Sequence, residues 1–237
     1  MKNKEIARKP QGGNGLAKKS SSSEISSFLQ AARAIDTNAS GRLIFAMDAT
    51  MSRQPSWDRA MTIQASMFDA VGKTGGLSVQ LVYFRGIDEC RASKWVINAR
   101  ALRDLMIRIN CMAGPTQIGK ILSHAQRENS KQKVSAMVYI GDCLEESVSE
   151  LYKKSGELGL LGVRCFFFQE GTDRGAENGF REMAGLTGGA YHRLGPDSAR
   201  ELAGLLQAVA VYAQGGLQSL ISANTREATL LLEQIKR

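Results

Sequence analysis

The chain has 237 residues, of which 43% are hydrophobic and 23% are charged, a composition typical of a soluble globular protein. No stretch approaches eighteen consecutive apolar residues, and no apolar segment follows the charged N-terminus. The sequence therefore predicts neither a transmembrane helix nor a secretory signal, and it favours a cytoplasmic protein. The net charge is +8 and residues 1–20 carry +5 of it, so the rest of the chain is too weakly basic to require a polyanionic partner.

The N-terminal segment differs in composition from the rest of the chain. Residues 1–22 are basic and rich in Gly, Ser, Lys and Asn, which predicts a disordered tail. Apolar residues then recur at helical spacing, which predicts a flanking amphipathic helix within residues 23–39. We expect the main domain over residues 40–215 and a C-terminal helix within residues 216–237.

After residue 40, short apolar runs alternate with amphipathic segments. Strands are predicted at 43–47, 77–84, 90–96, 134–140, 163–168 and 190–194, and helices at 56–71, 99–110, 117–127, 144–160, 177–186, 198–213 and 219–236. The run at 90–96 follows a tight turn and is expected as an edge strand antiparallel to its predecessor. The alternation predicts an α/β fold with a doubly wound, mostly parallel sheet and helices on both faces.

Polar side chains follow the first of these strands. Asp48, Thr50 and Ser52 lie on the predicted loop that leaves it, and Pro55 then suits the first turn of a helix. A carboxylate and two hydroxyls are hard oxygen donors, which suit Mg²⁺, Mn²⁺ or Ca²⁺ better than zinc.

Two further oxygen donors are expected at the same edge of the sheet. Thr116 lies in a Gly-Pro-Thr turn directly before a helix, and Asp142 follows Gly141 after the strand at 134–140. Because the carboxyl ends of parallel strands share one edge, Asp48 and Asp142 should face the same crevice. Five oxygens from three loops can hold one octahedral cation and leave a position for water or an incoming carboxylate.

The pattern Asp-x-Thr-x-Ser, then Thr in a Gly-x-Thr turn, then Asp after a strand resembles the metal-ion-dependent adhesion site (MIDAS) of von Willebrand factor A (VWA) domains, of the intracellular bacterial type. The resemblance covers nearly all of the predicted main domain and implies a Rossmann-like VWA fold. It implies that Thr50, Ser52 and Thr116 offer hydroxyls to a divalent cation, Mg²⁺ before Mn²⁺ or Ca²⁺, while Asp48 and Asp142 bind directly or through water. The family's usual Asp-x-Ser-x-Ser has Thr50 in its middle place, which keeps the oxygen and adds a methyl group.

The resemblance further implies a protein-interaction module with no catalytic step, whose cation receives the Asp or Glu carboxylate of a partner protein. Arg53 and Trp57 flank the hydroxyl loop and are expected at the rim of the partner-binding surface, although Trp57 fits the core equally well. An alternative is a nucleic-acid-associated scaffold that uses the basic tail. A third is a metal-dependent hydrolase with Asp142 as general base. No membrane partner is expected.

Glu145 and Glu146 are expected at the start of the helix after Asp142. There they would favour the helix dipole or support the ligands of the ion. The N-terminal N–H groups of the helix after Thr116 are expected to help attract an anionic ligand.

Other motifs point away from catalysis. The segment 114–121 nearly matches a P-loop, but Ile121 lacks the hydroxyl that would hold Mg²⁺ and no strand precedes Gly114. The cysteines form no C-x-x-C pair and are interpreted as reduced, mostly buried thiols. His124 and His192 have no obvious nucleophile partner, which indicates packing or surface roles.

Overall fold

The sheet is organised around β1 (Gly41–Asp48), whose residues are all buried. The structure is a computed structural model that describes residues 41–71, 76–195 and 198–235. Within it, β1 pairs in parallel with β2 (Leu77–Arg85) on one side and with β4 (Ala136–Gly141) on the other. A strand covered by helices on both faces must be apolar throughout, which explains the uninterrupted apolar run. The predicted tail and flanking helix lie outside the described residues.

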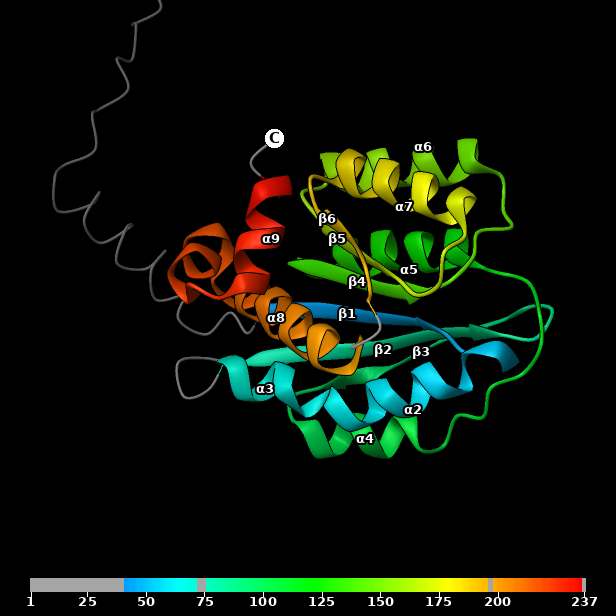
Figure 1. Ribbon diagram of the computed structural model, residues 1–237, viewed down its shortest axis with the longest axis horizontal. Coiled ribbons are helices and arrows are strands. Elements are labelled where there is room, and N and C mark those ends of the chain that lie inside the picture. Colours follow the sequence, from blue (N-terminus) through cyan, green and yellow to red (C-terminus); the bar gives the residue numbers. More distant parts are fainter. Residues whose placement is uncertain (1–40, 72–75, 196–197, 236–237) are drawn as a thin grey trace, which may run out of the picture. The chain divides into compact units, whose positions relative to one another are not determined.

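In the described ranges the sheet has six strands, in the order β3-β2-β1-β4-β5-β6 (Figure 1). The other strands are β3 (Glu89–Val96), β5 (Arg164–Gln169) and β6 (Ala190–Arg193). β3 runs antiparallel to β2 at the edge of the sheet, and the pairs from β2 to β6 are parallel. The predicted doubly wound, mostly parallel sheet with an antiparallel edge strand is therefore confirmed.

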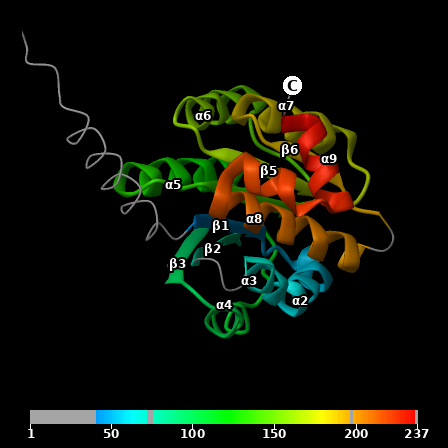
Figure 2. The same ribbon diagram turned by 90° about the vertical axis from the view of Figure 1, so that its left-hand side faces the viewer.

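Helices cover both faces of this sheet (Figures 1 and 2). One face packs against α2 (Gln54–Ile63), α3 (Ala65–Val71), α4 (Ala99–Met106), α8 (Ser198–Ala223) and α9 (Arg226–Ile235), and the other against α5 (Ile118–Lys131), α6 (Val148–Leu160) and α7 (Arg174–Thr187). Alternate residues of β1 enter the two cores: Leu43 and Phe45 belong to the first, and Ile44 and Ala46 to the second. This division follows from the two-residue period of a strand. No helix in the described part of the chain is long and apolar enough to cross a membrane.

Several predicted helix boundaries are wrong for local reasons. The helix predicted at 56–71 is divided at Gln64, between α2 and α3. The segment 219–236, predicted as one helix, is also divided. Its first part is the end of α8, which continues through a kink at Gly216 to Ala223, and its second part is α9, which begins at Arg226. Asn224 makes this break with a left-handed backbone (φ 49°), and the Thr225 hydroxyl accepts a hydrogen bond from the Ala228 N–H, which caps α9.

Candidate metal centre

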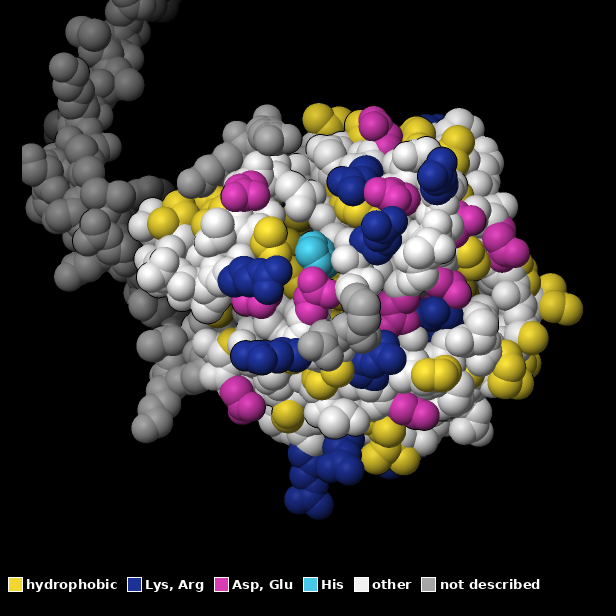
Figure 3. All heavy atoms as spheres, viewed as in Figure 1, with side chains coloured by type: hydrophobic (Ala, Val, Ile, Leu, Met, Phe, Trp, Pro, Cys, Tyr) yellow, Lys and Arg dark blue, Asp and Glu magenta, His cyan; other side chains and the backbone are white. Residues whose placement is uncertain are grey.

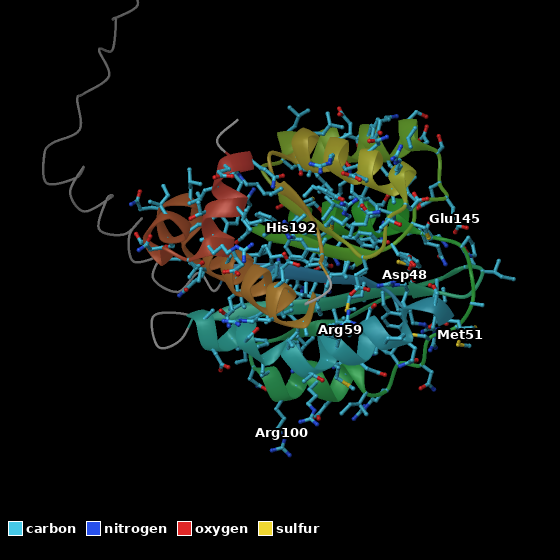
Figure 4. The ribbon with its side chains drawn as sticks, viewed as in Figure 1. Asp48, Met51, Arg59, Arg100, Glu145 and His192 are labelled. Atoms are coloured by element: carbon cyan, nitrogen blue, oxygen red, sulfur yellow. The ribbon has the colours of Figure 1, made fainter. Side chains whose placement is uncertain are left out.

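The loops after β1 and β4 leave neighbouring strands toward opposite faces of the sheet. The chain after β1 enters α2, and the chain after β4 enters α6 on the other face. Open α/β sheets bind ligands at such a switch point, beyond the carboxyl ends of the strands. Asp48 ends β1 and Asp142 directly follows β4, and Figure 4 shows Asp48 and Glu145 toward this end of the sheet.

Asp48 organises the loop that carries the predicted hydroxyl ligands. Its side chain is buried, and its Oδ1 accepts a hydrogen bond of 2.7 Å from the Thr50 N–H. This bond between a carboxylate and the backbone two residues on fixes the turn. The Thr50 Oγ1 lies 3.4 Å from the Ser52 Oγ. The structure therefore gathers the first three predicted ligands in one hydrogen-bonded loop.

The remaining carboxylate oxygens fit a divalent cation. Asp48 Oδ2 and Asp142 Oδ1 are buried, and neither has a hydrogen-bond partner among the residues that the structure describes. One carboxylate oxygen from each aspartate and the Cys143 Sγ lie within 4.8 Å of one another. A buried carboxylate oxygen without a donor or a cation is costly, so this pair has the chemistry of a metal site.

Burial shapes the protonation of this pair. Desolvation raises the pKa of Asp48 to about 6, and the charge of Asp142 adds to the rise, while hydrogen bonds from Thr50 and the charge of Arg53 oppose it. A bound cation favours the ionised carboxylate, so metal binding would offset the cost of keeping Asp48 charged in the interior.

Reciprocal hydrogen bonds attach the Thr116 turn to the loop after β4. The Thr116 N–H donates to Glu145 Oε2 at 2.9 Å, and the Glu145 N–H donates to Thr116 Oγ1 at 3.1 Å. Upstream, the Met112 N–H donates to the Ala49 carbonyl at 3.0 Å, which ties the same segment to the end of β1. The Thr116 hydroxyl accepts one bond here and keeps a second lone pair. The turn thus joins the two loops that carry Asp48 and Asp142.

Gly114 permits this arrangement. A Cβ at Gly114 would lie 2.0 Å from the carbonyl oxygen of Gly86 in the turn between β2 and β3. Only glycine allows the two backbones to approach so closely. The glycine that the sequence marks as a turn residue therefore also positions the Thr116 segment.

Glu145 and Glu146 lie in the loop before α6, which begins at Val148, so their predicted place in the first turn of that helix is wrong. Glu146 accepts hydrogen bonds from the Gly119 N–H at 2.8 and 3.2 Å. The chain's own carboxylate therefore occupies the N-terminus of α5, and the prediction that this end attracts an external anion is wrong. Glu145 instead holds Thr116, a predicted ligand of the ion.

Arg53 and Trp57 do not line the outer surface as predicted for the rim. Trp57 is 1% exposed and its indole N–H donates to the Met106 carbonyl, so the core interpretation of this residue is the right one. Arg53 is 7% exposed and points inward, where its Nη1 lies 3.2 Å from Asp142 Oδ2. Both side chains pack inward because α2 lies directly on the sheet.

Two residues near the centre were missed by the sequence reasoning. Glu170 follows β5 as Asp142 follows β4, so the same strand-end signal would have found it; it forms an ion pair with Arg53. Cys143 follows Asp142 in the sequence. Burial, and after it the charge of Asp142, raises the pKa of Cys143 to about 12, so without a metal this thiol is protonated at neutral pH.

The histidines have partners outside the centre, as predicted from their lack of a nucleophile. His124 Nε2 lies 2.8 Å from Gln80 Oε1, and His192 Nε2 lies 2.8 Å from Glu201 Oε1. Figure 4 shows His192 well away from Asp48. All four cysteines lie in the described ranges and are free thiols. Two are buried and two are half-buried, so the prediction that most are buried holds for only half of them.

Comparison with solved structures identifies the fold. A von Willebrand factor type A protein from Catenulispora acidiphila is similar over 75% of this chain and 43% of its own, with a TM-score of 0.60 and 15% identity. Proximal thread matrix protein 1 from the mussel byssus, with a zinc-occupied MIDAS motif, is similar over 81% of this chain and 52% of its own, with a TM-score of 0.59 and 17% identity. The SpRpn10 VWA domain is similar over 69% of this chain and 94% of its own, with a TM-score of 0.54 and 11% identity.

These likenesses show a VWA-like α/β fold. Comparison with family models and with curated proteins gives no match. The chain spans about half of the length of the mussel protein and less of the Catenulispora protein. Together the fold and the edge geometry define a VWA-like protein with a candidate metal centre that includes Asp48 and Asp142.

Proposed function

We propose that this chain is a divalent-cation-dependent protein-interaction module whose metal centre binds a carboxylate of a partner protein. The observation that carries the proposal is the pair of buried oxygens, Asp48 Oδ2 and Asp142 Oδ1, that lack a hydrogen-bond partner in the described ranges. They lie at the switch point of the sheet, where α/β folds bind ligands.

In this proposal five oxygens hold the cation, most readily Mg²⁺, with Mn²⁺ and Ca²⁺ as the other candidates. The ligands are Asp48, Thr50, Ser52, Thr116 and Asp142. The bound cation supplies an electrophilic position that accepts a carboxylate oxygen. The chain's own part is to hold its donors in place: the Asp48–Thr50 bond shapes one loop, and the Glu145–Thr116 bonds hold another.

Exposed apolar side chains near this edge support a protein partner. Met51, Ile87 and Met112 are 60%, 87% and 47% exposed and lie on the loops after β1, after β2 and before Thr116. Figure 4 shows Met51 at the same end of the sheet as Asp48, and Figure 3 shows hydrophobic side chains along that edge of the molecule. Methionine is enriched at protein interfaces, and exposed apolar side chains that gather in one place mark interaction sites. We propose that these residues form the rim.

We propose binding rather than catalysis because the candidate general base, Asp142, is in an ion pair with Arg53. The ion pair occupies Asp142 Oδ2, so this oxygen is already engaged by a side chain of the same centre. A cytoplasmic location and the division into a tail, a flanking helix, a main domain and a C-terminal helix belong to this proposal and rest on the sequence.

A thermal melt of the metal-free protein with added Mg²⁺, Mn²⁺ or Ca²⁺ tests the metal centre. A cation at one hundred times its dissociation constant should stabilise the wild-type protein by about 2.7 kcal/mol. The Asp48→Ala variant should fold and show no shift. A shift of equal size in Asp48→Ala would contradict the proposal.

Thr50 offers a matched pair of variants. Thr50→Ser keeps the hydroxyl and should retain the shift, whereas Thr50→Val keeps the shape and should lose most of it. Partner capture from a lysate should then require the cation, fail in EDTA and tolerate high salt. A salt-sensitive and EDTA-resistant partner would instead indicate nucleic-acid binding through phosphate contacts.

A further inference from the structure

A buried guanidinium lies beside the metal centre. Arg53 is 7% exposed, and its Nη1 lies 3.2 Å from Asp142 Oδ2. The other oxygen of that carboxylate, Oδ1, has no hydrogen-bond partner in the described part of the chain. Arg53 therefore takes one oxygen of Asp142 and leaves the other free for a cation.

Glu170 fixes Arg53 in this position. The Arg53 guanidinium forms an ion pair with Glu170 Oε2 and donates to the Ser56 Oγ, and the Ser56 hydroxyl donates to Glu170. Arg59 Nη1 binds the other oxygen of Glu170 at 2.7 Å. The Glu170 N–H donates to the Gly141 carbonyl at 3.0 Å, so the carboxylate that holds Arg53 is itself tied to the end of β4.

This network changes the charge that a ligand would meet. Asp48 and Asp142 would alone neutralise a divalent cation, but Arg53 offsets one of their negative charges. Arg59 offsets the charge of Glu170. Glu145 contacts Thr116 and adds a negative charge, but the positive charge of Arg53 lies directly against Asp142. Such a charge repels the cation and attracts an anion, because the interior screens it less than water does.

We propose that Arg53 is a specificity-determining residue of the metal centre: it weakens binding of the cation and strengthens binding of a partner's carboxylate to the loaded centre. This inference rests on the proposed function. It explains why an arginine next to a predicted ligand is buried and fixed by a carboxylate from another strand.

The test on the cation is calorimetric titration of Mn²⁺ and Mg²⁺ at constant pH. Arg53→Gln should bind Mn²⁺ roughly tenfold more tightly than the wild type, because a nearby positive charge is removed. Arg53→Lys keeps the charge and should stay close to the wild type. Arg59→Gln is the matched control: it loses the same charge from the same network without touching Asp142, and it should change the affinity much less.

The test on the anion uses acetate as the probe. Acetate is titrated against the Mn²⁺-loaded protein and followed through the water-proton relaxation of the bound ion. Arg53→Gln should bind acetate several-fold more weakly than the wild type, although it binds Mn²⁺ more tightly. Opposite changes in the two affinities are a result that a purely structural role of Arg53 would not produce.

The outcomes separate this inference from the proposed function. A wild-type protein that binds no cation overturns the proposed function, and the inference with it. A wild-type protein that binds Mn²⁺, with an Arg53→Gln variant that binds it no more tightly, overturns the inference alone. If the Arg53→Gln variant does not fold, the Glu170→Gln variant is the deciding test, because it removes a negative charge that contacts Arg53 and should weaken Mn²⁺ binding. Unchanged Mn²⁺ affinity in Glu170→Gln would overturn the inference.

Discussion

The two ends of β1 each carry a buried charged side chain, and the two side chains differ in whether the rest of the chain supplies partners for them. Arg42 near its start is 7% exposed, and Asp48 at its end is 1% exposed. The charge at the start is satisfied by other parts of the chain, whereas the carboxylate at the end keeps an oxygen without a partner in the described residues. One strand therefore carries a buried charge that is paired within the chain and a buried carboxylate with one unpaired oxygen in the described residues.

The start of β1 shows a buried charge with partners inside the chain, although burial still lowers the pKa of Arg42 against the opposing effect of Glu128. Arg42 lies 3.2 Å from Glu128 Oε2 and 3.9 Å above the centre of the Trp95 ring. The Glu128 oxygens also accept hydrogen bonds from Trp95 Nε1 at 2.9 Å and Lys131 Nζ at 2.7 Å. Burial alone would raise the pKa of Glu128, but the bonds from Lys131 and Trp95 outweigh it and hold the pKa below its usual value. This cluster needs nothing from outside the chain.

The comparison shows how an energetically unfavourable feature, a buried polar atom without a partner, can indicate a candidate binding site. Natural proteins satisfy their buried polar groups almost everywhere, and the exceptions concentrate where a ligand completes the site. Five buried side-chain atoms in the described residues lack a partner, and two of them, Asp48 Oδ2 and Asp142 Oδ1, belong to carboxylates that lie together at the edge where α/β folds bind ligands. The following predictions separate the two ends of the strand.

The largest effect is expected at the start of β1. Glu128→Gln leaves the Arg42 guanidinium buried without its counter-charge, which should lower the free energy of unfolding by roughly 3 kcal/mol. Urea denaturation measures this. Glu177→Gln is the matched control, since its ion pair with Arg181 is largely exposed and its loss should cost less than about 0.5 kcal/mol. Equal losses in both variants would contradict the comparison.

The opposite sign is expected at the end of β1. Asp48→Asn removes a buried charge while its amide oxygen still accepts from the Thr50 N–H, so the variant should be about 1–3 kcal/mol more stable than the wild type without metal. The same variant should lose the thermal shift that cations produce. Asp104 is exposed, so the control variant Asp104→Asn should neither gain stability nor lose the cation-induced thermal shift. A less stable Asp48→Asn variant would show that the carboxylate is structural.

The pH dependence sharpens the comparison through the raised pKa of Asp48, about 6 in the folded chain. As the pH falls through this value the folded state takes up a proton and the unfolded state does not. The wild type therefore gains stability relative to Asp48→Asn, and roughly half of the difference at pH 7 should be lost by pH 5. Urea midpoints between pH 5 and 8 measure it.

The difference in free energy of unfolding between the wild type and Glu128→Gln should stay nearly constant between pH 5 and 8. The pKa of Glu128 in the folded chain lies below its usual value, so the carboxylate is ionised in both states above the usual value. Its stabilising contribution is lost only as the pH falls from the usual value through the lower folded value. If the stability difference for Glu128→Gln changes with pH in the same way as that for Asp48→Asn, the change reflects a general effect of pH and not the titration of Asp48.

The sequence by itself determined the sheet and the meeting of two aspartates at its edge. Strand periodicity and apolar runs report local burial, and they correctly gave a mostly parallel sheet with an antiparallel edge strand. Asp48 and Asp142 were predicted to face one crevice because each follows a parallel strand, and the structure brings their carboxylates together. The ligand roles of Thr50, Ser52 and Thr116 stay predictions.

Only the tertiary structure decided which side chains point inward at the centre. The sequence placed Arg53 at the rim and left Trp57 open between the rim and the core, and the structure buries both. The bonds from Glu145 to Thr116, from Glu146 to Gly119 and from Arg53 to Glu170 join loops that are far apart in the sequence. Local patterns record how a residue relates to its own helix or strand, whereas these contacts depend on how separate strands end side by side, which only the assembled sheet determines.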